Sequence, residues 1–187
     1  GAGGLGGGLR ISGGTVMILK SLITGNVADR GGGILFNAGT TTIDAVEAAR
    51  IAAQGFDYVG ISLDGLRETH DRFRRKAGAF DASLAALRML RARGVKVGLR
   101  YTMTDMNAGD LPALLQLMRD EQVDKFYFSH LNYAGRGNIH RGRDAHFAAT
   151  RDALDRLFEA AWQDAVAGGH LEFVTGNNDA DGVYLLQ

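Results

Sequence analysis

Short apolar runs alternate with helical stretches along most of this sequence, and this alternation is the feature that most constrains its fold. Each run is rich in β-branched and aromatic residues, as expected of a strand that is buried on both faces. Strand and helix in such regular order predict parallel strands joined by right-handed crossovers, which is an α/β fold. An open doubly wound sheet and a (β/α) barrel both fit the pattern. The runs are FDYVGISLD (56–64), VKVGLRYTM (95–103), KFYFSHLN (125–132) and HLEFVTG (170–176).

The helical stretches carry recognisable start and stop signals. Asp81 can cap the start of a helix that Gly94 ends. Asp110 can cap a second helix, with Pro112 in the first turn, where proline is tolerated. A third, amphipathic helix is predicted from about residue 144 to 166. Its apolar positions are Phe147, Leu154, Leu157, Phe158, Ala161 and Trp162.

The first 50 residues carry weaker signals. GILFNAGTTTIDAVEAARIAAQG (33–55) can form a short strand, a polar loop and a helix that ends at Gly55, and LRISGG (9–14) can form a strand that runs into a glycine turn. Glycine accounts for 27 of the 187 residues and is concentrated here, and glycine-rich chain costs more entropy to order. We therefore expect residues 1–50 to be a poorly matching remnant of early βα units and residues 51–187 to hold the regular part of the fold.

Composition excludes several classes of partner and chemistry. The 21 Lys and Arg residues balance the 21 Asp and Glu residues, which argues against nucleic acid as a partner. No apolar run approaches the roughly 18 residues of a membrane span, so we expect no membrane partner and a cytoplasmic protein. The sequence contains no cysteine, which excludes disulfides, a cysteine nucleophile and thiolate-bound metal within these residues.

Three successive predicted strands become polar where they end. Ser62 and Asp64 follow the first apolar run, and Arg100, Tyr101 and Thr102 end the second. In parallel α/β folds, ligands bind at the carboxyl ends of the strands. The pattern therefore predicts a binding site at this edge. The third strand contributes Ser129, His130, Asn132 and Tyr133.

Two further patterns do not predict a metal site. NNDADG (177–182) is similar to the first half of a calcium loop but lacks the bidentate glutamate, so we expect an Asx-rich turn. The five histidines do not form a ligand pattern.

The stretch YVGISLDGLRETHDRFRRKAGAFDASLAALRMLRARGVKVGLRYT (58–102) resembles the radical S-adenosylmethionine (SAM) superfamily. GLRYTMTDMNAGDLPALLQLM (98–118), VDKFYFSHLNYAGRGN (123–138) and EFVTGNNDADGVYLL (172–186) are most similar to its haem d1 biosynthesis branch. The resemblance implies a partial (β/α)6 barrel, incomplete at the N-terminal side. It also implies SAM and a 4Fe–4S cluster that cleaves SAM to a deoxyadenosyl radical, which then abstracts hydrogen from a substrate at the barrel mouth.

The resemblance implies cofactor-binding roles for several residues. Ser12, Gly13 and Gly14 match the start of a Gly-Gly-Glu-Pro motif that holds the SAM amino group, although Thr15 and Val16 replace the last two residues. Ser62 matches a serine near the SAM ribose and carboxylate, and Asp64 accompanies it at the functional rim. Arg74 and Arg100 are alternative partners for the SAM carboxylate.

The resemblance also implies a tetrapyrrole substrate derived from sirohaem, whose propionate side chains are converted, and a reductant protein as a further partner. The loop from residue 130 to 138 would face the tetrapyrrole. Its expected substrate-binding residues are His130, Asn132, Tyr133 and Arg136, whose donors suit propionate carboxylates.

The largest departure from the family is the missing C-x3-C-x2-C loop, without which no cluster can be held. We therefore expect a fragment or a degenerate copy of an enzyme, inactive by itself. Two alternatives stay open. One is another extended radical SAM enzyme, either a haem-pathway decarboxylase or a peptide-modifying enzyme. The other is a cluster-free barrel module without catalysis.

Overall fold

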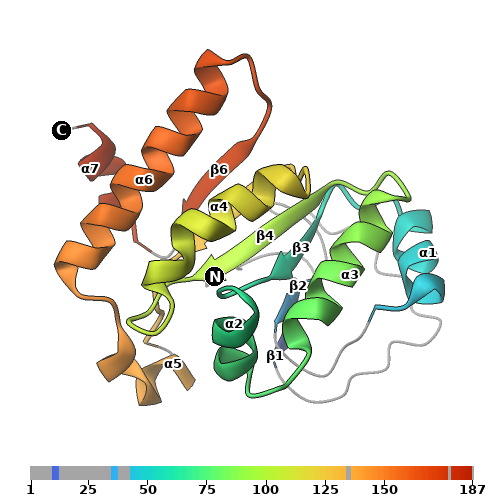
Figure 1. The fold of residues 1–187 in the computed structure, drawn as a ribbon, viewed down its shortest axis with the longest axis horizontal. Helices are drawn as coiled ribbons and strands as arrows, with labels where there is room; N and C mark the ends of the chain where they lie inside the picture. The colour runs from blue at the N-terminus through green and yellow to red at the C-terminus, as the bar shows by residue number, and fades with distance from the viewer. Residues whose placement is uncertain (1–9, 13–34, 38–42, 134–135, 177, 187) are drawn as a thin grey trace, which may run out of the picture. The chain divides into compact units, whose positions relative to one another are not determined.

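The computed structural model describes residues 10–12, 35–37, 43–133, 136–176 and 178–186 (Figure 1). The chain divides into two compact units. The first comprises Gly1–Ser62 and Asp81–Gly98, and the second comprises Leu63–Phe80 and Leu99–Gln187. The predicted boundary between residues 1–50 and 51–187 differs from this division and stays a prediction.

The first unit contains parallel strands in chain order. β1 (Arg10–Ser12) pairs with β2 (Leu35–Asn37), and β2 pairs with β3 (Val59–Ser62) through Phe36 and Ile61. The Val59 N–H donates to the Lys96 carbonyl at 2.9 Å, just before the start of β4 (Val97–Thr102). The strands expected from the LRISGG and GILFN segments are therefore present.

Two helices of this unit begin and end for local reasons. α1 (Ala45–Ala53) starts at Asp44, whose carboxylate accepts the Glu47 N–H at 2.8 Å. α3 (Ala79–Arg91) is followed by a turn that contains the predicted terminal glycine, Gly94, which has φ of +75° and whose N–H donates to the Arg91 carbonyl. The helices bury Ala48, Ile51, Ala86, Leu87 and Leu90, and β3 buries Val59 and Ile61.

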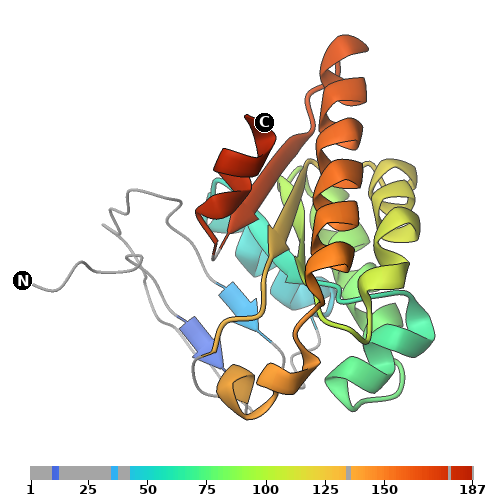
Figure 2. The ribbon, with the colours of Figure 1, turned by 90° about the vertical axis from the view of Figure 1, so that its left-hand side faces the viewer.

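The second unit contains the rest of β4, then β5 (Lys125–Ser129) and β6 (Glu172–Gly176). β5 and β6 are parallel, in register from the Lys125–Glu172 pair to the Ser129–Gly176 pair. The helices α4 (Leu111–Asp120) and α6 (Phe147–Val166) contact each other, and α6 runs alongside β6 (Figure 2). The core of this unit is Tyr101, Leu111, Leu114, Met118, Phe126, Phe128, Leu154 and Leu157.

Short helices connect these elements. α2 (Arg67–Arg74) and a 3-10 turn, η1 (Ala108–Asp110), precede α4. α5 (Arg136–Ile139) and η2 (Arg141–Arg143) lie between β5 and α6, and α7 (Ala180–Leu185) follows β6. No helix in the described part of the chain is both long and apolar enough to cross a bilayer.

The four main strands and the helices between them confirm the sequence prediction, but three details were wrong. Asp81 lies inside the first turn of α3, because Asp71 accepts the Phe80 N–H at 2.8 Å and the Gly78 N–H at 2.7 Å. Asp110 stands at the N-cap position of α4, but its carboxylate accepts the Leu66 N–H instead of a helix N–H. α6 starts at Phe147, not near residue 144.

The buried face of α6 is also narrower than predicted. Leu154 and Leu157 are buried, but Phe147 is 75% exposed and Trp162 is 65% exposed. Ala153 and Ala160 complete the buried seam in their place. Small side chains let a helix approach its neighbours closely, so the large aromatic residues are left on the outer face.

Candidate functional site

Asp64 is the centre of a polar network in the second unit. Its side chain is buried, with 1% of its surface exposed. Oδ1 accepts the Thr102 N–H at 3.1 Å, and Oδ2 forms an ion pair with Nη2 of Arg74. Burial raises the pKa of the Asp64 carboxyl, while the Arg74 guanidinium and the Thr102 N–H act in the opposite direction. Because both oxygens contact protein groups, the carboxylate holds Arg74 and does not face an open site.

Arg74 is the last residue of α2, and its side chain is 13% exposed. The helix stops there because Arg75 adopts the left-handed conformation, with φ of +54°. The buried carboxylate therefore restrains the guanidinium of Arg74, which still reaches the surface. A guanidinium has five N–H donors in a fixed plane, so a group held in this way can also bind a second anion.

His70 is buried next to Asp64 and bonds its backbone. It is 1% exposed, and its Nδ1 accepts the Asp64 backbone N–H at 2.9 Å. Its ring packs edge-on against Phe80, with centroids 6.3 Å apart. Burial and the nearby Arg74 charge lower the pKa of His70 to about 4, although Asp71 acts in the opposite direction. At neutral pH the ring is therefore uncharged, with its proton on Nε2.

Asn107 is a buried member of the network that the sequence analysis did not identify. Its Nδ2 donates to the carbonyls of Asp64 and Thr102, each at 2.9 Å, and its Oδ1 accepts the Thr104 N–H at 2.7 Å. Asn107 thus joins the end of β4 to the turn that contains Asp64. An asparagine in a polar turn often bonds nearby backbone, but the bond to Asp64 spans 43 residues and leaves no local signal.

The residues at the end of β4 serve different roles. Tyr101, noted as polar from the sequence, is a core residue, and its hydroxyl donates to the Asn107 carbonyl at 2.9 Å. Burial, with the charges of Asp64 and Asp110, raises the pKa of the Tyr101 phenol. Arg100 places its guanidinium over the Tyr127 ring, 4.1 Å from the centroid. Arg100 is therefore anchored on β5, and Arg74 is anchored on a carboxylate.

A second cluster follows β5. Nε2 of His130 lies 2.9 Å from each carboxylate oxygen of Asp181, which is buried in α7. The sequence analysis predicted a role for His130 but none for Asp181. Tyr133 donates its hydroxyl to Asp144 and packs under Arg141, while Asn132 is exposed. Arg136 is the first residue of α5. The prediction that these residues bind substrate stays a prediction.

The remaining predicted cofactor residues lie in the first unit. Ser12 is the last residue of β1, and Ser62 is the last residue of β3. Both therefore occupy the carboxyl ends of parallel strands, where ligands bind in such folds. Gly13 and Gly14 lie outside the described residues.

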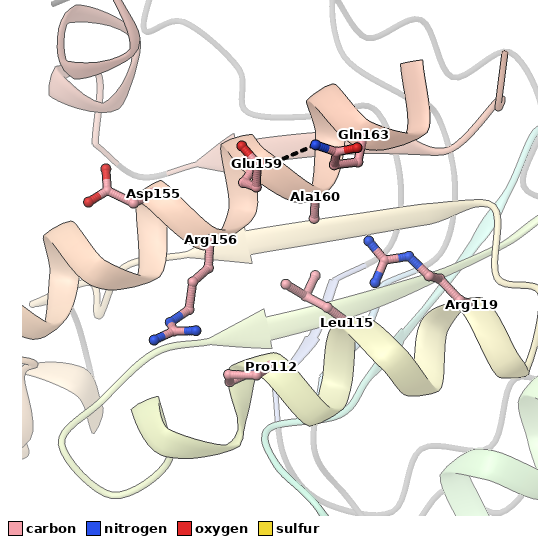
Figure 3. A pocket seen from close by; sticks show the side chains of 8 residues that line it. All are labelled: Pro112, Leu115, Arg119, Asp155, Arg156, Glu159, Ala160 and Gln163. Atoms are coloured by element: carbon pink, nitrogen blue, oxygen red, sulfur yellow. Dashed lines mark hydrogen bonds between the residues drawn. The ribbon is translucent and has the colours of Figure 1, made fainter. Parts of the chain in front are cut away.

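One cavity of the second unit lies away from the strand ends. It has a volume of about 530 Å³ and lies between α4 and α6 (Figure 3). Leu115 and Ala160 form its apolar part, and Gln163 donates to Glu159 beside it at 2.6 Å. None of the predicted site residues lines this cavity. The other lining residues are Pro112, Arg119, Asp155 and Arg156.

The side chains fit the two expected cofactors unequally. The guanidinium groups of Arg74 and Arg100 are suitable partners for the carboxylate of SAM. A 4Fe–4S cluster requires thiolates, and the sequence has no cysteine, so these residues do not fit the cluster. Within the described residues, no group of three or more His, Asp or Glu side chains could hold a metal ion.

Comparisons with known proteins identify the family of this chain. A sequence profile of the radical SAM superfamily matches residues 4–118. Pre-heme d1 synthase of Dinoroseobacter shibae is 55% identical over 147 residues, which are 78% of this chain and 36% of that protein. Fe-coproporphyrin III synthase of Methanosarcina barkeri is 37% identical over 176 residues, which are 93% of this chain and 44% of that protein. The chain therefore spans less than half the length of each of these relatives.

Solved structures share the fold at low sequence identity. SuiB of Streptococcus suis, bound to the precursor peptide SuiA, superposes with a TM-score of 0.63 and 14% identity over 82% of this chain and 33% of SuiB. Native anSMEcpe with bound AdoMet gives a TM-score of 0.56 and 17% identity over 76% of this chain and 40% of that chain. The profile and these likenesses confirm the predicted α/β fold of the radical SAM type.

Proposed function

This chain belongs to the radical SAM superfamily, and we propose that it forms the barrel portion of an enzyme of haem d1 biosynthesis that acts on the propionate side chains of a sirohaem-derived tetrapyrrole. The observation that carries the proposal is the 55% identity to pre-heme d1 synthase across 78% of the chain. The polar carboxyl edge supports it, because Arg74 and Arg100 are cations anchored where such a fold binds its ligands. A reductant protein is the expected further partner.

The described residues are proposed to bind SAM and cannot hold a cluster. SAM and a 4Fe–4S cluster are the cofactors of the superfamily, and SAM supplies the reactive group when it is bound. Arg74 or Arg100 would bind its carboxylate, with Ser62 near its ribose. Asp64 and Asn107 would hold Arg74 and the end of β4 in place. A sequence without cysteine supplies no cluster ligand, so we propose that the chain is inactive by itself.

A chimeric enzyme tests the proposal. The aligned 147 residues of this chain would replace their counterpart in the Dinoroseobacter shibae enzyme, which would be reconstituted anaerobically with iron and sulfide. We expect the chimera to cleave SAM and to convert its tetrapyrrole substrate, whereas the isolated chain should show neither cluster absorbance nor SAM cleavage. Assembly of a cluster in the chimera without SAM cleavage would contradict the proposed role, and a cluster on the isolated chain would contradict its inactivity.

A second candidate function has its own support. The Methanosarcina barkeri Fe-coproporphyrin III synthase aligns with 93% of the chain, more than the first relative does, which favours a decarboxylase of a haem pathway. The matching chimera in that protein separates the two candidates. Conversion of substrate only in the Methanosarcina context would favour the decarboxylase, and conversion only in the Dinoroseobacter context would favour the haem d1 enzyme. Peptide modification and a cluster-free barrel module remain as further alternatives, and both predict that neither chimera converts a tetrapyrrole.

A further inference from the structure

We propose that Tyr127 and Gly176 are positioning residues for Arg100, and that their fit sets how Arg100 presents itself to a bound carboxylate. Gly176 leaves the space that the phenol end of Tyr127 occupies, and the Tyr127 ring fixes the direction of the Arg100 guanidinium. The identity of the carboxylate, that of SAM, rests on the proposed function. The contacts among the three residues do not depend on it.

Tyr127 lies on the face of β5 that is opposite the core. Its neighbours in the strand, Phe126 and Phe128, are fully buried, whereas Tyr127 is only partly buried. Successive side chains of a strand point to opposite faces, so Tyr127 shares its face with Val174, its partner in β6. Arg100 of β4 places its guanidinium over the Tyr127 ring, 4.1 Å from the centroid. The contact between Arg100 and Tyr127 is therefore on the face of the sheet that the aromatic core does not occupy.

The phenol end of Tyr127 lies against the backbone of Gly176, two residues beyond Val174 in β6. A Cβ added at Gly176 would lie 2.7 Å from Cζ of Tyr127 and 3.0 Å from Cε1, and closer still to the hydroxyl oxygen. Ordinary van der Waals contact begins at 3.4 Å, so any other residue at this position would collide with the ring. Glycine within a strand often marks such a close approach.

The backbone of Gly176 is held in place, so an added side chain would move the ring instead. Gly176 pairs with Ser129 at the end of the β5–β6 ladder, and its carbonyl accepts the His130 N–H at 3.4 Å. A phenol is rigid and clears an obstacle only by swinging as a whole, here by about 1 Å at its hydroxyl end. The three atoms nearest to the added Cβ all belong to Tyr127. A methyl group at position 176 would therefore affect Arg100 through the ring.

The direction of a guanidinium decides which carboxylate it can bind with two hydrogen bonds. Its five N–H donors lie in one fixed plane, and a carboxylate accepts two of them only when it lies close to that plane. The electron-rich face of a tyrosine ring attracts the cation and thus restrains its direction. The proposal concerns this direction, and it holds whichever other protein group shares the N–H donors of Arg100.

A purely structural explanation is that Tyr127 only covers the sheet and that Gly176 only makes room for it. Four substitutions separate the two explanations. Tyr127→Phe keeps the ring, and Tyr127→Leu removes it but keeps an apolar side chain. Gly176→Ala displaces the ring. Gly182→Ala is the matched control, because it adds the same methyl group in the same unit at a position with open space around it.

NMR of the isotope-labelled full chain measures the position of the ring relative to Arg100. The readout is the Nε–Hε signal of Arg100, which Arg100→Lys identifies by removing it. The ring current of Tyr127 should shift this signal upfield in the parent, in Tyr127→Phe and in Gly182→Ala. The shift should disappear in Tyr127→Leu and should decrease in Gly176→Ala.

Titration of the same samples with SAM and with decarboxylated SAM measures recognition of the carboxylate. The ratio of the two dissociation constants isolates this contact, because the second ligand lacks only the carboxylate. We expect the preference for SAM to fall about tenfold in Tyr127→Leu and in Gly176→Ala, and less than about twofold in Tyr127→Phe and in Gly182→Ala. The double variant of Tyr127→Leu and Gly176→Ala should lose no more than Tyr127→Leu alone, because the methyl group acts only through the ring.

Each outcome supports or overturns one step. An Arg100 signal that is the same in Tyr127→Leu and in the parent would overturn the positioning role, because another contact would then orient the guanidinium. Additive losses in the double variant would overturn the route from Gly176 through Tyr127. A changed signal with an unchanged preference for SAM would leave the two residues purely structural. If the parent does not prefer SAM over the decarboxylated ligand, the carboxylate role of Arg100 in the proposed function fails, and the Arg100 signal alone then decides whether Tyr127 and Gly176 position it.

Discussion

Acid should destabilise this protein through His70. The ring is buried and uncharged, and its Nδ1 accepts the Asp64 N–H, so protonation of Nδ1 would remove that bond and bury a positive charge near Arg74. Its pKa is about 4 in the folded chain, against 6.5 for an ordinary histidine. The difference of about 2.5 pH units is equivalent to about 3.4 kcal/mol at about 1.36 kcal/mol per unit.

The direction of the His70 pKa shift determines whether stability rises or falls with pH. Because the folded pKa lies below the unfolded one, the unfolded chain takes up the proton first as the pH falls. The stabilisation is complete above the unfolded pKa of 6.5 and is lost between 6.5 and about 4. By about pH 5 the free energy of unfolding should have fallen by about 2 kcal/mol through this group alone.

Urea unfolding of the parent and of His70→Asn at several pH values measures the contribution of His70 to the free energy of unfolding. Asparagine places an acceptor near the position of Nδ1 but does not titrate. The variant should be less stable at about pH 7.5, because it loses the contact with Phe80, and the difference from the parent should shrink by about 2 kcal/mol at about pH 5. Leu114→Ala is the control, since it destabilises the same unit without a titrating group. If the difference between the parent and His70→Asn stays constant over this range, the reasoning is wrong.

Three further predictions concern Asp64, its surroundings and the two candidate arginines. Gly65→Ala should cost about 2–3 kcal/mol of unfolding free energy, because Gly65 has φ of +148° and a Cβ there would lie 2.7 Å from Thr69 Cγ2; Gly109→Ala, with open space, should cost far less. Asn107→Ala should cost about 3 kcal/mol of unfolding free energy, because it removes the side-chain bonds to the buried Asp64 carbonyl and the part-buried Thr102 carbonyl; a loss no larger than that of an exposed-asparagine variant would refute its role as a junction. In the chimera, Arg74→Lys or Arg100→Lys should weaken SAM binding in a calorimetric titration, and unchanged affinity in both would refute the carboxylate role.

The sequence predicted the elements that depend on local patterns. The strand around Val59 and Ile61 was recognisable because a doubly buried strand is continuously apolar. The end of α3 was predicted because Gly94 supplies a left-handed residue at little cost. The edge of the sheet that carries polar residues could also be predicted. In parallel α/β folds, ligands bind at the carboxyl ends of the strands, so strand direction alone identifies that edge.

The connections within the site could not be predicted in this way. Asp81 was expected to cap α3, but the acceptor comes from Asp71, on the preceding helix. Asp181 bonds His130 from 51 residues further along the chain. A hydrogen-bond partner at such a distance is set by how the elements pack, and no spacing or composition rule encodes it.

The pairing of Asp64 with Arg74 indicates how the two candidate arginines differ. A buried ion pair adds little net stability, because desolvation offsets most of the attraction, so the pair is not explained by stability alone. Asp64 neutralises the charge of Arg74 but fixes its plane, so Arg74 would recognise a carboxylate mainly through the direction of its N–H groups. Arg100 instead places its guanidinium over the Tyr127 ring, 4.1 Å from the ring centroid. Different contacts therefore orient the two guanidinium groups: a buried carboxylate holds Arg74, and an aromatic ring lies against Arg100.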